Sequence, residues 1–178
     1  PLVSYTGTLS GPGSFNLTAL PEGMSATLVS NTDDKRLDLN VTAVPAAVGA
    51  SSTWINLVGG NAGGDWGTSA NWSAAVPNGA DAIADFSTLD LTVASYVNND
   101  APHTAGTLRF GDAAASHDWY VTNSTLALAT SVGVPFVTVS NRTATIVSGL
   151  TGTQGFMKDG GGTLSLSGGT TNTFGGPV

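Results

Sequence analysis

The chain has no cysteine, so it has no disulfide framework, no thiolate metal site and no catalytic thiol. Charged residues make up only 10% of its 178 residues, against about 25% in an ordinary soluble domain. Five basic residues stand against twelve acidic ones, which gives a net charge of −7. Nucleic acid and anionic lipid would be repelled by this charge, so we expect neither as a partner.

Good helix formers are also scarce. Glu22 is the one glutamate, and no segment carries apolar residues at the spacing of an amphipathic helix. The longest uncharged stretch, between Asp38 and Asp65, is broken by Pro45 and several glycines, so we expect no membrane insertion by this segment. The chain is nevertheless 40% hydrophobic, which is too apolar for a disordered protein. These features exclude a helical bundle and a disordered chain.

Glycine, serine and threonine are abundant instead, with 24, 18 and 24 residues. Apolar and polar residues alternate in residues 36–42, 89–93, 136–140 and 163–167, which is the pattern of a half-buried β-strand. Gly, Asn, Asp or Pro interrupts such runs about every 8–12 residues, as is typical of an all-β sandwich, barrel or solenoid.

The pattern of apolar and polar residues changes near residue 46. Residues 1–46 predict a small β module, and residues 47–53 are small, uncharged and without alternation, which predicts a linker. Residues 54–178 then form a second domain of about nine short strands. A long loop inside one domain is the alternative. In the first module we expect four strands, around residues 3–9, 14–20, 26–30 and 37–44.

The most specific signal lies in residues 149–177. Gly-Gly-Gly-Thr-Leu-Ser-Leu-Ser-Gly occupies residues 160–168 and Asn-Thr-Phe-Gly-Gly occupies residues 172–176. With Lys158 before the glycines, and Phe174 in place of the usual tyrosine, this order resembles the autotransporter-associated β-strand repeat. About 30 residues match closely.

The resemblance implies a secreted, surface-displayed bacterial protein, because the repeats of that family build right-handed parallel β-helices in passenger regions. Residues 66–81 are loosely similar to the region that often precedes such repeats. We therefore predict an all-β fold, with a parallel β-helix or β-solenoid main region and an antiparallel β N-terminal region; a β-sandwich is the alternative. The opening Pro1-Leu2-Val3 is interpreted as the start of a processed or excised segment.

A solenoid turn cannot close its own apolar face and needs a stacked neighbour. We therefore expect an open strand edge at the C-terminal end and an extended N-terminal segment that completes the edge of the next copy. Coverage of both edges within one chain is the alternative. The residues expected at these assembly edges are Leu2, Val3 and Tyr5, and Leu164, Leu166 and Phe174.

These features favour a non-catalytic structural protein outside the cell or on its surface, a unit of a filament, stalk or matrix assembled from copies of itself. The alternative is an adhesin or glycan-binding module. Its candidate sugar contacts are the rings of Trp54, Trp66 and Trp72, although tryptophan more often fills a core.

Candidate catalytic residues are few. Asp81 and Asp85 share one predicted strand face, with Asp90 near in sequence, but no second cluster would separate their pKa values as a glycosidase requires. His117 precedes Asp118, yet no nucleophile motif accompanies the pair. His103 has no second ligand at zinc spacing. We predict no catalytic site, no metal and no cofactor, and an enzyme that degrades polysaccharides is the least favoured hypothesis.

Calcium is the metal that the sequence suits best, because Asp33, Asp34 and Asp38, and the loop at residues 59–65, offer oxygen ligands. A single Asp in a glycine turn is usually a turn former. Five Asn-X-Ser/Thr sequons are candidate glycosylation sites: Asn16, Asn40, Asn71, Asn123 and Asn141.

Overall fold

The computed structural model describes residues 3–4, 6, 25–43, 49–167 and 172–178. The chain divides into two compact units, residues 1–46 and 47–178. The first unit is an antiparallel sheet of three strands in the order β1-β3-β2, with bounds β1 Val3–Ser4, β2 Ser25–Asn31 and β3 Arg36–Ala43. The predicted strands at residues 26–30 and 37–44 are found, and the one at 14–20 lies outside the described residues.

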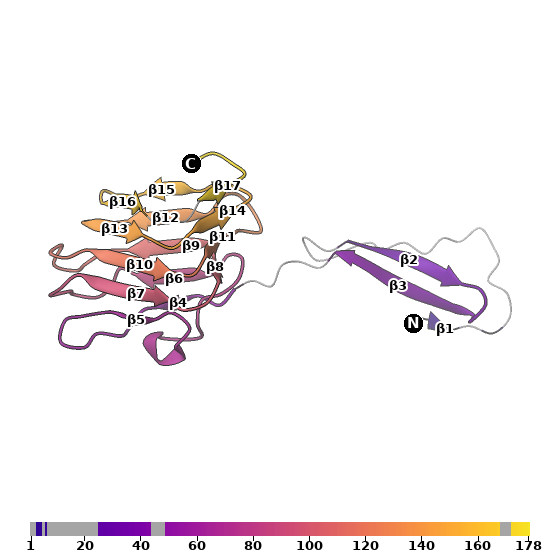
Figure 1. Ribbon diagram of the computed structural model, residues 1–178. Helices are drawn as coiled ribbons and strands as arrows, with labels where there is room; N and C mark the ends of the chain where they lie inside the picture. The colour runs from indigo at the N-terminus through magenta and orange to yellow at the C-terminus, as the bar shows by residue number, and fades with distance from the viewer. Residues whose placement is uncertain (1–2, 5, 7–24, 44–48, 168–171) are drawn as a thin grey trace. The chain divides into compact units, whose positions relative to one another are not determined.

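The second unit is a β-solenoid of about four turns. Its strands form three parallel sheets, and Figure 1 shows strands of successive turns lying one above another. The first sheet has the order β15-β12-β9-β6-β4, the second β16-β13-β10-β7-β5 and the third β17-β14-β11-β8. An all-β fold with a parallel solenoid and an antiparallel N-terminal region is therefore confirmed, and the alternative of a β-sandwich is wrong.

Each full turn contributes one strand to each sheet. The strands of the first sheet are β4 Ser52–Thr53, β6 Ile83–Phe86, β9 Thr107–Phe110, β12 Phe136–Val139 and β15 Met157–Asp159. Those of the second are β5 Gly64–Asp65, β7 Ser95–Asn99, β10 Trp119–Asn123, β13 Thr143–Ile146 and β16 Thr163–Leu166. Those of the third are β8 His103–Ala105, β11 Leu126–Leu128, β14 Leu150–Gly152 and β17 Thr173–Phe174. A single 3₁₀ turn, η1 Ser69–Asn71, lies in the described part.

The core follows from alternation along these strands. Phe86, Phe110 and Val139 occupy paired positions on β6, β9 and β12 and are all buried. The rings of Phe86 and Phe110 stack with centroids 5.2 Å apart. Because stacked turns place equivalent residues side by side, each inward row becomes a continuous apolar column.

The turn between β15 and β16 explains the lysine and the glycines of the repeat motif. Lys158 donates from Nζ to the carbonyl of Gly160 and, at 2.5 Å, to that of Gly162. A Cβ on Gly162 would lie 2.7 Å from the backbone of Asn141. The motif therefore combines a cation that ties the turn together with a glycine that lets two turns approach closely.

Two predictions of local structure are wrong. Within the predicted linker 47–53, the Gly49 N–H donates to Ala80 O at 2.7 Å and Ser52–Thr53 form β4, so residues 49–53 belong to the solenoid. Residues 89–93 form no strand. Leu91 is buried there, and its N–H donates to the Asp112 side chain, so the alternation marks a corner that inserts one side chain into the core.

Candidate functional site

The C-terminal turn forms an edge in all three sheets. Each of β15, β16 and β17 is the last strand of its sheet among the described residues, and each pairs with the preceding turn, on β12, β13 and β14. A strand with one neighbour presents unpaired N–H and C=O groups on its other side. We call these three strands the open edge.

The predicted assembly residues on β16 lie at this edge. Thr163 and Ser167 donate their N–H groups toward the preceding turn, at 2.8 and 3.0 Å. N–H groups alternate between the two sides of a strand. Those of Leu164 and Leu166 therefore point to the open side.

The N–H of Phe174 on β17 also points to the open side. The N–H of the next residue, Gly175, donates to Gly152 O on β14 at 2.9 Å, and neighbouring N–H groups point to opposite sides. Its ring packs edge-on against Phe156 with centroids 5.1 Å apart. Leu166 is 36% exposed and Met157 is 53% exposed. The open edge therefore combines free backbone groups with apolar side chains.

The N-terminal edge residues are only partly described. Val3 pairs with Leu37 in the antiparallel β1–β3 ladder. Leu2 and Tyr5 lie outside the described residues.

The opposite end of the solenoid is covered. The segment after η1 runs along the outer side of β4, where Ser73 N–H donates to Thr53 O at 2.9 Å and Ile55 N–H donates to Asn71 O at 2.8 Å. Trp54 and Trp72 form an antiparallel bridge in the same place. The two ends of the stack are therefore different.

The three candidate sugar-binding tryptophans fill this covered end. Trp54 and Trp66 are fully buried and Trp72 is 3% exposed. Each indole N–H donates to a backbone carbonyl, at 2.8, 2.9 and 2.7 Å respectively. No face of these rings is open to a sugar, so the hypothesis that they contact glycans is wrong. They pack as a core because their N–H groups are satisfied internally.

The candidate carboxylates have separate structural partners. Asp81 precedes β6 and accepts the Ser131 N–H at 2.9 Å. Asp85 accepts the Ser87 hydroxyl at 2.6 Å and lies 3.6 Å from Arg109. Asp90 is exposed. Asp81 and Asp85 therefore do not form an acid–base pair on one strand face. Asp81 binds a loop backbone, and Asp85 forms an ion pair.

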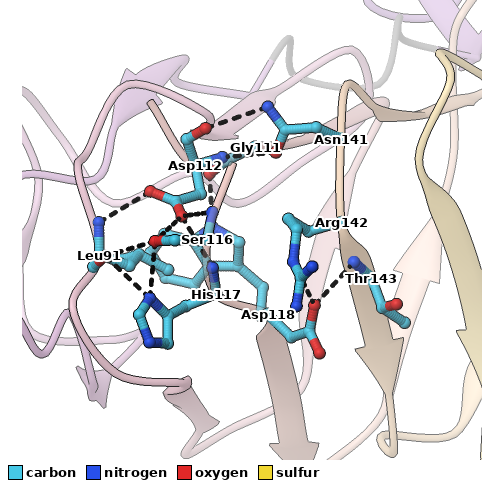
Figure 2. Close-up of polar contacts among 10 residues, drawn as sticks. Leu91, Gly111, Asp112, Ser116, His117, Asp118, Asn141, Arg142 and Thr143 are labelled. Carbon is cyan, nitrogen blue, oxygen red and sulfur yellow. Dashed lines mark hydrogen bonds and ion pairs between the residues drawn. The ribbon is translucent and has the colours of Figure 1, made fainter. Parts of the chain in front are cut away.

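Figure 2 shows the polar cluster around Asp112, in the loop between β9 and β10. The buried Asp112 carboxylate accepts the N–H groups of Leu91 at 2.8 Å, Ser116 at 2.6 Å and His117 at 2.9 Å. Burial alone would raise the pKa of Asp112, but these bonds and one from the Ser116 hydroxyl lower this pKa to about 2. The carboxylate thus stays charged and holds the corner together.

The same cluster places a serine against a histidine, with Ser116 Oγ 2.7 Å from His117 Nδ1. Nδ1 also lies 3.0 Å from Leu91 O. The serine hydroxyl lies 2.9 Å from Asp112 Oδ2, to which it donates. The hydroxyl also lies 3.0 Å from Leu91 O, so Ser116 and His117 share the acceptors of this corner.

Asp118 does not orient His117. Its Oδ1 accepts the Thr143 N–H at 3.0 Å and lies 3.5 Å from Arg142 Nε, and Figure 2 shows these contacts reaching toward the next turn. The Asp118 carboxylate therefore links its loop to the next turn of the solenoid.

His103 lies in the core instead of at a ligand site. It is 7% exposed, its Nδ1 lies 2.8 Å from Asn99 Oδ1, and its ring stacks on Trp66 with centroids 5.5 Å apart. Desolvation lowers the pKa of His103, against smaller opposing effects of the Ala101 backbone and Asp100. The ring is therefore a neutral packing element near pH 7.

The sequons differ in accessibility. Asn40 is exposed on β3, and Asn123 is exposed at the end of β10, where it donates to Asn98 at 2.6 Å. Asn71 is half-buried and donates to Asp65 O, and Asn141 is held by the backbone of Asp112. Asn16 lies outside the described residues.

Most of the acidic residues that were candidate calcium ligands make ion pairs or hydrogen bonds within the chain. Asp34 and Asp38 lie 3.2 and 2.8 Å from the Arg36 guanidinium, and Asp65 accepts the Asn98 amide at 2.7 Å; Asp33 is exposed. In the described part of the chain, no three His, Cys, Asp or Glu side chains gather as metal ligands.

Over the same residues, no helix has the length and apolarity needed to cross a bilayer. Comparison with known proteins adds no relative: no family model, no curated protein and no solved structure matches the chain.

Proposed function

We propose that the chain is a non-catalytic structural protein of the bacterial cell surface, a repeating unit of an extracellular filament, stalk or matrix that assembles end to end through terminal β-strands. The observation that carries the proposal is the difference between the two ends of the solenoid. One end is covered by the tryptophan core and the segment after η1, and the other presents the open edge.

The covered end disfavours direct stacking of one solenoid on another. The partner of the open edge is then a strand of the N-terminal unit of the next copy, at Leu2, Val3 and Tyr5, because a sheet edge accepts an added strand through backbone hydrogen bonds alone. The resemblance of residues 149–177 to the autotransporter-associated repeat supports the same surface location.

The first test of this assembly is a substitution at Leu166, on the open edge. Leu166→Pro removes an outward N–H while the bonds from Thr163 and Ser167 to β13 remain, and an edge strand tolerates proline in that orientation. Leu166→Ala is the control, because it shortens the side chain and keeps the N–H. We expect filaments in electron micrographs of the unaltered chain and of Leu166→Ala, and single particles for Leu166→Pro.

A second test identifies the partner strand. The chain has no cysteine, so the double variant Val3→Cys/Leu166→Cys carries two thiols. Head-to-tail assembly gives a ladder of oxidised oligomers on a non-reducing gel, whereas Leu166→Cys alone gives at most dimers. A chain that stays a single particle at every concentration, with no ladder, contradicts the proposal.

The alternative function is a glycan-binding module. The buried tryptophans do not support it, but the outer face of the second sheet does.

A further inference from the structure

Two tyrosines form a stacked pair on the outer face of the second sheet. Tyr96 on β7 and Tyr120 on β10 occupy paired positions, and their rings lie 4.5 Å apart between centroids with an interplanar angle of 12°. Tyr120 is half-buried. Tyr96 is 54% exposed although one face of its ring is covered, so its exposure comes from the opposite face and the edge.

A glycine lies next to Tyr96 on that opposite side. The ladder pairs Gly64 with Val97, which places Gly63 beside Tyr96 on the side away from Tyr120. A Cβ at Gly63 would lie 3.0 Å from the Tyr96 carbonyl oxygen. The Asn61 side-chain oxygen lies equally close to that Cβ position, at 3.0 Å. Gly63 itself adds no ring to the stack, so the aromatic stack ends at Tyr96.

A row of polar side chains runs beside this stack, with Asn98 two residues after Tyr96 and Asn123 three residues after Tyr120. Asn98 Nδ2 donates to Asp65 Oδ1 at 2.7 Å, and Asn123 Nδ2 donates to Asn98 Oδ1 at 2.6 Å. Asp65 and Asn123 are exposed. The bonds between these side chains fix their orientation, so their remaining donors and acceptors are held in place.

We propose that Tyr96 and the Asp65–Asn98–Asn123 row form a binding site for a neutral polysaccharide. A pyranose ring has an apolar face of C–H groups and a rim of hydroxyls. The negative face of an aromatic ring attracts the polarised C–H groups, and planar amides and carboxylates beside it bind the hydroxyls. The net charge of −7 and the Asp65 carboxylate disfavour acidic polymers such as uronans.

This site is independent of the open edge. It lies on β5, β7 and β10, near the covered end of the stack, and β16 is at the far side of the same sheet. A chain that assembles through the open edge could therefore display one such site per copy.

The test is affinity electrophoresis of the full chain through native gels that contain hydroxyethylcellulose, a soluble β-1,3-glucan or a neutral mannan. Retardation of the unaltered chain in at least one gel is expected. Tyr96→Ala should weaken that binding about tenfold, Tyr96→Phe should stay within about threefold, and Phe136→Ala should leave it unchanged, since the loss of one aromatic contact is about 1.4 kcal/mol. Phe136 is the matched control because it is an exposed aromatic side chain on a different sheet.

Migration of the unaltered chain through all three gels without retardation overturns the proposal. Equal binding by Tyr96→Ala, with unchanged thermal unfolding, overturns it as well. The assembly variant Leu166→Pro keeps Tyr96, so it should bind each polymer as the unaltered chain does in its single-particle form. This result separates failure of the sugar site from failure of assembly.

Discussion

The Asn141 side chain makes two hydrogen bonds to the backbone of Asp112, one turn away. Its Oδ1 accepts the Asp112 N–H at 3.0 Å and its Nδ2 donates to the Asp112 carbonyl at 3.0 Å. The Asn141 side-chain amide therefore makes the two hydrogen bonds that the backbone of a neighbouring strand would make, at a corner where the strands have ended. The corner that holds the buried carboxylate thus depends on a residue from the following turn.

We expect Asn141→Ala to lower the free energy of unfolding by about 2 kcal/mol, because it leaves the Asp112 N–H without a partner and removes one of the two donors to the Asp112 carbonyl, which keeps the Ala115 N–H at 2.9 Å. Urea unfolding measures this change. Thr88→Ala, an exposed loop position, is the control and should stay within about 0.5 kcal/mol. A glycan attached to Asn141 Nδ2 would disturb the same pair of bonds, so we expect no modification there in the folded chain.

The low pKa of Asp112 leads us to expect a loss of stability in acid. Its pKa is about 2 in the folded chain, below the ordinary value, so the charged form stabilises the fold. That stabilisation is fully present above about pH 4 and is lost as the pH falls from about 4 to about 2. The predicted contribution is about 2 kcal/mol.

The measurement compares the unaltered chain with Asp112→Asn in urea at several pH values. We expect the variant to be less stable at pH 7, and the difference to shrink toward pH 2. A constant difference over that range would contradict the assignment.

His103 predicts a second pH effect of the same sign. Its folded pKa lies below the ordinary value, so protonation is easier in the unfolded chain. Stability should therefore decrease as the pH falls below about 6.5. His103→Gln should remove this slope, while His117→Gln, at the other histidine of the chain, should retain it.

The glycines of the repeat motif offer a matched pair. A Cβ at Gly162 meets the backbone of Asn141 at 2.7 Å, whereas at Gly161 the nearest atom is Ser140 O at 3.7 Å. We expect Gly162→Ala to destabilise the C-terminal turn by about 1–3 kcal/mol and Gly161→Ala to be tolerated. Thermal unfolding with hydrogen exchange of β15 and β16 distinguishes the two. Equal effects would mean that Gly162 is not a close-approach position.

The long alternating segments of the sequence were sufficient to predict their strands. Residues 136–140 and 163–167 contain β12 and β16. Val137 and Val139 of β12 are buried, and Leu164 of β16 packs partly buried against the core. The same alternation failed at residues 89–93, where Leu91 enters the core from a corner and bonds to a side chain. Two-residue strands such as β4 and β17 carry too few residues to show a period at all.

The sites were harder to predict, because exposure depends on which residues stack. Nothing in the composition distinguishes a buried Trp54 from an exposed Tyr96. A usable signal was nevertheless present: Tyr-Val occurs at residues 96–97 and again at 120–121, a spacing of one solenoid turn according to the paired positions. Gly-Thr-Leu also recurs, at residues 7–9, 106–108 and 162–164, but these spacings are irregular.

The placement of the tryptophans has a practical consequence for spectroscopy. Three of the four indoles occupy the covered end, and the fourth, Trp119, lies on β10 in the second turn of strands. Emission from these rings reports the first half of the stack and is blind to the turn that carries β15, β16 and β17. Fraying of the last turn would leave the tryptophan fluorescence unchanged. An unfolding curve recorded by tryptophan fluorescence would therefore overestimate the stability of the end where copies are proposed to meet.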